Sequence, residues 1–137
     1  MNYEPLTESE RTAARKEFEK LDHMADKAYV PVINTYKVHR PMLNRRLMRR
    51  LERLDLRTLI AISETYEMHI RSQVTHQLVQ NRIDQLIVQI TGEQELRQLQ
   101  AFYKTTNGDY RTGNVIRQQL ERLGYEEPWK PVVNRFY

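Results

Sequence analysis

The chain has 137 residues, the length of one domain, and its composition of 39% hydrophobic and 29% charged residues is typical of a globular protein. It contains no cysteine, which excludes a disulfide framework and a thiolate metal site and fits a reducing compartment. The first residues lack the apolar stretch of a secretory signal, and no window has the length of a membrane span. We therefore expect a cytoplasmic protein, or a component of a particle assembled inside the cell, without a membrane partner.

The formal net charge of +4 is concentrated in one segment. Residues 39–57 hold seven of the sixteen arginines and only two acids, Glu52 and Asp55. This segment therefore carries +5, and the remainder of the chain sums to −1. The basic character is local, and it predicts a patch on the surface and not a uniformly basic protein.

The N-terminal third predicts one helix followed by an extended connector. Thr7 and Glu10 have the spacing of a capping box, and apolar residues recur behind them at helical spacing, so we expect a helix over 8–29. The stretch 31–40 begins with one proline and is followed by another. It is rich in β-branched and aromatic residues, which indicates extended geometry.

A second helix is expected over 41–54, with Pro41 in its first turn. At about 100° per residue, its side chains separate into an apolar arc and a basic arc on opposite sides. The apolar arc holds Leu43, Leu47, Met48, Leu51 and Leu54. The basic arc holds Arg45, Arg46, Arg49, Arg50 and Arg53, and Arg40 and Arg57 flank the helix.

Asp55 is placed to cap a third helix, which we expect to run as one long central helix to Ile90 because neither glycine nor proline interrupts it. Its apolar stripe changes side near residues 79–81. This shift indicates either a break there or, as we favour, two halves that pack against different neighbours.

The last third predicts two shorter helices and an extended arm. Thr91 with Gln94 has the spacing to cap a fourth helix through Tyr103, and a turn follows at Asn107-Gly108, with a small hairpin as the alternative. A fifth helix is expected over 114–123, with Gly124 as its C′ residue. The predicted fold class is thus all-α: a single compact bundle of four or five helices over 1–124, and an extended arm over 125–137.

No catalytic signature is present. His69 and His76 share one face of the expected third helix, but seven residues correspond to about 10.5 Å of rise, too far for two ligands of one zinc. With Gln73 and Gln80 they are expected to be boundary residues with satisfied hydrogen bonds. We expect no enzyme, no cofactor, no metal site and no small-molecule substrate.

The arginines of the second helix offer planar donor forks to phosphates or carboxylates. Within the helix only Arg49 and Glu52 are spaced for an ion pair. On the first helix Glu19, Asp22 and Asp26 form an acidic stripe that can neutralise part of the basic arc, but three acids cannot match it. Phosphates, an acidic protein partner and solvent remain as alternatives for the rest.

The predicted arm is unusually apolar. Its anchor candidates are Trp129, Val132, Val133, Phe136 and Tyr137. Such an arm either folds back over the core or docks into a groove of a neighbouring subunit.

Taken together, these features predict a non-enzymatic interaction protein, a small helical subunit of a larger assembly of the viral-particle or ribonucleoprotein kind. Its partner is a protein or a second copy of the chain. The alternative is a sequence-nonspecific nucleic-acid-binding or regulatory protein. In both cases the binding residues are Arg40, Arg45, Arg46, Arg49, Arg50, Arg53 and Arg57.

Overall fold

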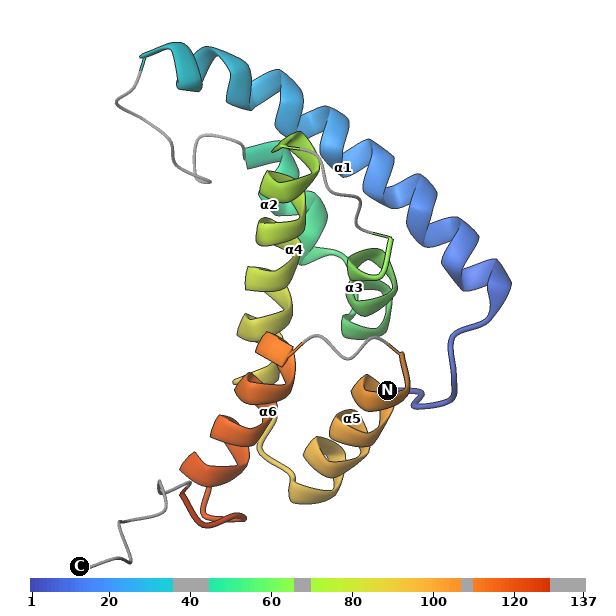
Figure 1. Ribbon diagram of the computed structural model, residues 1–137, viewed down its shortest axis with the longest axis vertical. Helices are drawn as coiled ribbons and strands as arrows, with labels where there is room; N and C mark the ends of the chain where they lie inside the picture. Colours follow the sequence, from blue (N-terminus) through green and yellow to red (C-terminus); the bar gives the residue numbers. More distant parts are fainter. Residues whose placement is uncertain (36–44, 66–69, 107–109, 129–137) are drawn as a thin grey trace, which may run out of the picture.

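Figure 1 shows a computed structural model, which describes residues 1–35, 45–65, 70–106 and 110–128. Over these ranges the chain forms six helices and no strand, so the all-α class is confirmed. The helices are α1 Glu8–Thr35, α2 Arg45–Glu52, α3 Leu56–Ser63, α4 Ile70–Ile87, α5 Glu93–Thr106 and α6 Tyr110–Arg122.

The long helix α1 crosses one side of the molecule and packs against α2, α3 and α4 (Figure 1). Helix α4 also packs against α6, which pairs with α5 at the end away from α2. Every helix contributes apolar side chains to one buried core. Its fully buried members include Leu21, Leu47, Leu51, Leu59, Ile60, Ile62, Ile83, Ile87, Leu96, Leu99, Ile116 and Leu120.

Helix α1 begins as predicted and ends later than predicted. The Thr7 N–H donates to Glu10 Oε1 (3.0 Å), and the Glu10 N–H donates to Thr7 Oγ1 (3.1 Å), which confirms the capping box. The helix then continues through Pro31 to Thr35, so the extended connector predicted from residue 31 is wrong over 31–35. A proline removes one helical hydrogen bond without forbidding the turns that follow it. Residues 36–40 lie outside the described residues.

The predicted long central helix is wrong, because α3 ends at Ser63 and α4 begins at Ile70. Its start is confirmed: Asp55 is the N-cap and accepts from the Thr58 N–H (2.9 Å). Its end needs neither glycine nor proline, because Thr65 donates both its N–H (3.0 Å) and its hydroxyl (2.8 Å) to the Ile62 carbonyl. A threonine that binds nearby backbone competes with helical hydrogen bonding.

The break allows α3 to pack back against α4, and a buried polar chain joins the two to α6. The Ser63 hydroxyl donates to Gln80 Oε1 (3.0 Å), and Gln80 Nε2 donates to Thr112 Oγ1 (2.7 Å). All three residues are buried, so the boundary position predicted for Gln80 is wrong. Because these three side chains are hydrogen-bonded to one another, they fix how α3, α4 and α6 pack together.

The C-terminal helices largely follow their sequence signals. On α5 the apolar residues Leu96, Leu99 and Phe102 are all buried. Helix α6 begins at Tyr110, earlier than predicted, and α5 reaches Thr106. Because helices occupy both flanks, the alternative hairpin around residues 107–109 is wrong, although those three residues lie outside the described part.

Helix α6 ends at the predicted glycine. Gly124 has φ +82°, a left-handed conformation that favours glycine. The Gly124 N–H donates to the Glu121 carbonyl (3.0 Å), and the Tyr125 N–H donates to the Leu120 carbonyl (2.9 Å). These two bonds form a Schellman motif, which confirms Gly124 as the C′ residue.

One side chain of α3, that of Arg57, ties distant parts of the chain together. Its guanidinium donates to the Glu10 carboxylate through Nε (2.6 Å) and Nη2 (2.7 Å). The guanidinium also lies 5.4 Å from the centre of the Phe102 ring on α5. Its remaining hydrogen bonds reach the backbone carbonyls of Asn2, Glu4 and Pro5. The hydrogen bond from Arg57 is the main cause that lowers the pKa of Glu10 from 4.5 to about 2.

We predict that Arg57→Met lowers the free energy of unfolding by about 2–3 kcal/mol at pH 7, because it leaves the Glu10 carboxylate and three carbonyls of the N-terminal segment without their donor. Urea denaturation measures this. The pKa of Glu10 is lowered on folding, so its contribution is complete above pH 4.5 and is lost as the pH falls toward about 2. The difference between variant and wild type should therefore shrink over that range.

The control Arg15→Met, at a side chain 60% exposed, should change stability by less than about 0.5 kcal/mol. If Arg15→Met lost as much stability as Arg57→Met, the result would contradict the role of Arg57 in stabilising the fold.

Candidate functional site

Helix α2 is fixed by its apolar arc, as the sequence predicts, but it ends at Glu52, two residues before the predicted end. Residues 41–44 of the predicted helix lie outside the described residues. Leu47 and Leu51 are each 1% exposed, and Met48 and Leu54 are partly buried against the core. The helix packs on α1 and α4 through this arc. The opposite arc therefore faces solvent. Leu43, the remaining member of the apolar arc, lies outside the described residues.

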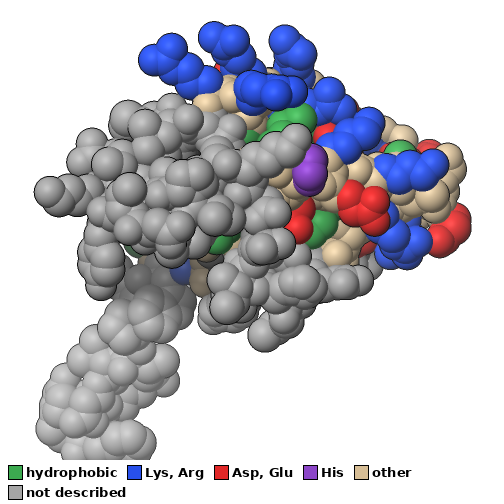
Figure 2. All heavy atoms as spheres, turned by 90° about the horizontal axis from the view of Figure 1, so that it is seen from above, with side chains coloured by type: hydrophobic (Ala, Val, Ile, Leu, Met, Phe, Trp, Pro, Cys, Tyr) green, Lys and Arg blue, Asp and Glu red, His purple; other side chains and the backbone are tan. Residues whose placement is uncertain are grey.

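Four arginines of the basic arc are exposed, and we call them the arginine surface: Arg45, Arg46, Arg49 and Arg53. None of the described acidic side chains forms an ion pair with any of them, and the predicted pair between Arg49 and Glu52 is not formed. Figure 2 views the molecule from the end where α2 lies and shows Lys and Arg side chains gathered along one edge. Arg40 lies outside the described residues.

The fifth arginine of the arc, Arg50, is engaged within the chain. Its Nε and Nη2 donate to the two carboxylate oxygens of Glu17 on α1, at 3.1 and 2.6 Å. The Glu17 side chain is only 14% exposed. This hydrogen bonding is the main cause that raises the pKa of Arg50. Arg50 therefore positions α2 against α1, and its guanidinium is already occupied.

The prediction that the acidic stripe of α1 faces the arginines is wrong. Glu19 is exposed and makes no ion pair with a described residue, and Asp22 accepts from the Thr75 hydroxyl on α4 (2.8 Å). The side chain of Asp26 lies outside the described residues. Because Phe18 and Leu21 turn toward the core, the edge of α1 that meets α2 is the one carrying Glu17. A rotation of α1 of this kind cannot be read from α1 alone.

Arg57 differs most from the sequence prediction. It was expected on the exposed binding face, yet it is 8% exposed and its donors are engaged by Glu10 and by three carbonyls of the N-terminal segment. A buried guanidinium with these partners contributes to the fold and offers nothing to a ligand. The arginine surface therefore consists of the four exposed side chains of α2 and its C-terminal turn.

The two ion pairs also fix the direction of α1. Glu10 pairs with Arg57 and Glu17 pairs with Arg50, so the order along α1 is the reverse of the order along α2 and α3. Both intervals are seven residues, which is about two helical turns on α1, whereas residues 50–57 include the turn between α2 and α3. Helix α1 therefore runs antiparallel to α2, with its Glu17 edge along the seam between them.

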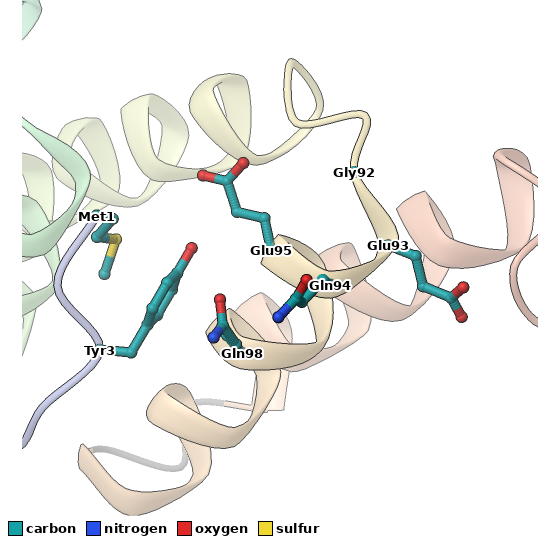
Figure 3. A pocket seen from close by; sticks show the side chains of 7 residues that line it. All are labelled: Met1, Tyr3, Gly92, Glu93, Gln94, Glu95 and Gln98. Atoms are coloured by element: carbon teal, nitrogen blue, oxygen red, sulfur yellow. The ribbon is translucent and has the colours of Figure 1, made fainter.

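A second region of interest is a shallow hollow between the N-terminal segment and the start of α5 (Figure 3). Its lining residues are Met1, Tyr3, Gly92, Glu93, Gln94, Glu95 and Gln98. Burial is the main cause that raises the pKa of Tyr3, and the nearby Glu95 carboxylate adds to it. The hollow is open and polar, and within the described residues no group of three His, Asp or Glu side chains is placed to hold a metal ion.

Only His76 of the predicted pair of histidines lies in the described part of the chain. His76 Nε2 lies 3.4 Å from the Ser63 hydroxyl, beside the polar chain that joins α3, α4 and α6. His69 lies outside the described residues, as does the side chain of Gln73.

The base of the predicted arm is held against the body. The Tyr125 hydroxyl donates to the Thr91 carbonyl (2.7 Å), and Arg97 donates to Glu126 (3.1 Å) and to the Tyr125 carbonyl (3.2 Å). The anchor candidates beyond it lie outside the described residues: Trp129, Val132, Val133, Phe136 and Tyr137. The division of the chain at residue 124 stays a prediction.

No protein-family model, no curated protein and no solved structure matches this chain. None of the helices in the described ranges is long and apolar enough to cross a membrane. The candidate function therefore depends on the geometry of the arginine surface.

We predict that Arg50→Gln and Arg49→Gln differ in their effect on folding, although the residues are neighbours on α2. Arg50→Gln leaves the largely buried Glu17 carboxylate without its donor and should lower the free energy of unfolding by about 1–2 kcal/mol. Arg49→Gln should change it by less than about 0.5 kcal/mol, because its side chain is exposed. Chemical denaturation of the two variants checks this. Equal effects would show that the pair with Glu17 does not hold α2.

Proposed function

We propose that this chain is a non-enzymatic interaction protein, a small helical subunit that docks on an anionic surface of a larger assembly through the arginine surface. One observation carries the proposal. Four exposed guanidiniums stand on a helix that is fixed from behind by Leu47 and Leu51, and no described acid pairs with them.

The unpaired charge has an energetic cost that a partner would relieve. Like charges one turn apart on a helix repel, here between Arg45, Arg49 and Arg53. The two acids of α1 that meet α2 and α3 do not offset this repulsion, because Glu17 and Glu10 are engaged by Arg50 and Arg57. An anionic surface would remove the repulsion and would meet guanidiniums on a helix that is already ordered.

The proposal predicts binding to polyanions through α2. We expect the wild-type chain to bind a fluorescently labelled oligonucleotide or poly-L-glutamate at low salt. The variant Arg45→Gln/Arg46→Gln/Arg49→Gln/Arg53→Gln should lose at least about tenfold in affinity for whichever polymer binds. Fluorescence anisotropy measures both affinities.

The matched control is Arg15→Glu/Lys104→Glu, which reverses two exposed charges outside the arginine surface and lowers the net charge by the same amount, four. It should retain most of the affinity, because the arginine surface is intact. The proposal is wrong if neither polymer binds, if the four-Gln variant binds like wild type, or if the control loses as much affinity.

The arm is proposed as a second docking element that reaches a neighbouring copy of the chain. The bonds of Tyr125 and Glu126 to Thr91 and Arg97 give it a fixed starting point on the body. Its apolar anchors follow from residue 129 onward, and burying them in a neighbour would remove them from water.

We predict that deleting residues 129–137 abolishes self-association and leaves the helical body intact, because the bonds of Tyr125 and Glu126 are kept. Circular dichroism measures the helical content, and sedimentation velocity measures the mass in solution. The full-length chain should sediment as an oligomer at high protein concentration and the variant as a monomer. A monomeric wild type, or a truncated chain that keeps its oligomeric state, would contradict this role of the arm.

A further inference from the structure

We propose that the partner of the arginine surface is the phosphodiester backbone of a nucleic acid, bound without regard to sequence, and that the surface extends across the seam onto α1 through Lys16 and Lys20. This inference rests on the proposed function and names the chemical class of its partner.

The extension onto α1 follows from the seam that the Glu17–Arg50 pair defines. Lys16 and Lys20 are both exposed and lie beside Glu17 on α1, one residue before it and one turn after it. Because the helices are antiparallel, one turn forward on α1 corresponds to one turn back on α2. From the Glu17–Arg50 contact we therefore infer that Lys20 is level with Arg46, which precedes Arg50 by one turn.

Basic side chains lie on both sides of the seam between α1 and α2, and the Glu17 carboxylate in this seam is already paired with Arg50. Glu17 is engaged by two hydrogen bonds from Arg50, so its charge is not available to Lys16 or Lys20. Neither lysine forms an ion pair with a described acidic side chain. On α2 the exposed carboxylate among the described residues is Glu52. Six cations thus share one surface: Lys16, Lys20, Arg45, Arg46, Arg49 and Arg53.

The composition of this surface favours phosphates over a protein partner. The core of a protein–protein interface is depleted of charged residues and contains apolar side chains. Here the apolar side chains of α2, Leu47 and Leu51, are turned inward, and what remains outside is cationic. Protein–nucleic acid interfaces are more polar and much more positively charged.

The geometry also suits a repeating anion. Arg45 and Arg49 are separated by about 6 Å of helical rise, which is comparable with the separation of successive phosphates along a strand, and Arg53 follows in the turn after α2. The guanidinium fork matches the oxygens of a phosphate and keeps its charge at any working pH. The described residues of α2 include no aromatic side chain, and Phe18, which lies between the two lysines in the sequence, is buried. Bases therefore have no aromatic stacking partner there, and contacts to the backbone alone give no sequence preference.

The test is a titration of labelled single- and double-stranded oligonucleotides, and of poly-L-glutamate of matched charge, at about 50 and 200 mM salt. We expect both oligonucleotides to bind at least tenfold more tightly than poly-L-glutamate. Six phosphate contacts should cost the wild-type chain roughly two and a half decades of affinity for the single strand and about three for the double strand over this range of salt. Two unrelated base sequences should bind alike.

The variant Lys16→Gln/Lys20→Gln tests the part of the surface on α1. It should weaken oligonucleotide binding by about tenfold and lower the salt slope by roughly 1–2, because two phosphate contacts are lost. The control Arg15→Gln/Lys104→Gln removes two exposed charges elsewhere and should keep the wild-type slope. Both pairs are exposed, so urea denaturation should show unchanged folding.

The outcomes separate this inference from the proposed function. Poly-L-glutamate bound as tightly as the oligonucleotides, with the loss confined to the four-Gln variant, would overturn the phosphate assignment and leave an acidic protein as the partner. Lysine and control variants with the same affinity would overturn the extension onto α1. No binding to either polymer would overturn both the inference and the proposed function.

Discussion

Arg57 and Glu10 form the contact from which the arrangement of α1, α3 and the N-terminal segment follows. The carboxylate of Glu10 serves two purposes, because Oε1 accepts both from the Thr7 N–H and from Arg57, while Oε2 accepts from Arg57 alone. The cap of α1 and its attachment to α3 therefore use one side chain. The same guanidinium fixes three carbonyls of the N-terminal segment and covers Phe102 on α5. Two helical turns further along, Glu17 and Arg50 repeat the attachment and set the position of α2.

The arginines of residues 45–57 thus fall into two groups, according to whether they pair with a carboxylate of α1. Arg50 and Arg57 meet carboxylates of α1 in two-pronged contacts and contribute to the fold. The other four arginines of the basic arc, Arg45, Arg46, Arg49 and Arg53, meet no described carboxylate and make up the arginine surface. Because the first group fixes α2 and α3 against α1, the second group is held in place before any partner arrives. The proposed function depends on this division.

The sequence predicted those features that are set by neighbouring residues. The capping box at Thr7, the cap at Asp55, the C′ glycine at position 124 and the inward face of α2 all depend on spacings of a few residues, and the structure confirms them. The features that depend on contacts across the chain were missed. Arg57 and Glu10 are 47 residues apart, and the periodicity of one helix does not reveal the rotation that presents Glu17 and not Glu19.

Two features of the sequence indicate contacts that the prediction missed. Glu10 and Glu17 have the same spacing as Arg50 and Arg57, which is the pattern expected of two antiparallel helices joined by paired charges. Thr65, two residues past the end of α3, offered a hydroxyl to end a helix that neither glycine nor proline interrupts. The lysines of α1 gave no signal of their own, because their relation to the arginine surface exists only across the folded seam.

The most direct test of the account is an amide ¹H–¹⁵N correlation map of the labelled protein recorded with and without a short single-stranded oligonucleotide. The account predicts that shifted resonances cluster in α2 and around Lys16 and Lys20 of α1, on both sides of the Glu17–Arg50 pair. The side-chain Nε–Hε signal of Arg57 should not move, because that guanidinium is buried and engaged. Shifts confined to α5 and α6, or a map that the oligonucleotide leaves unchanged, would contradict the account.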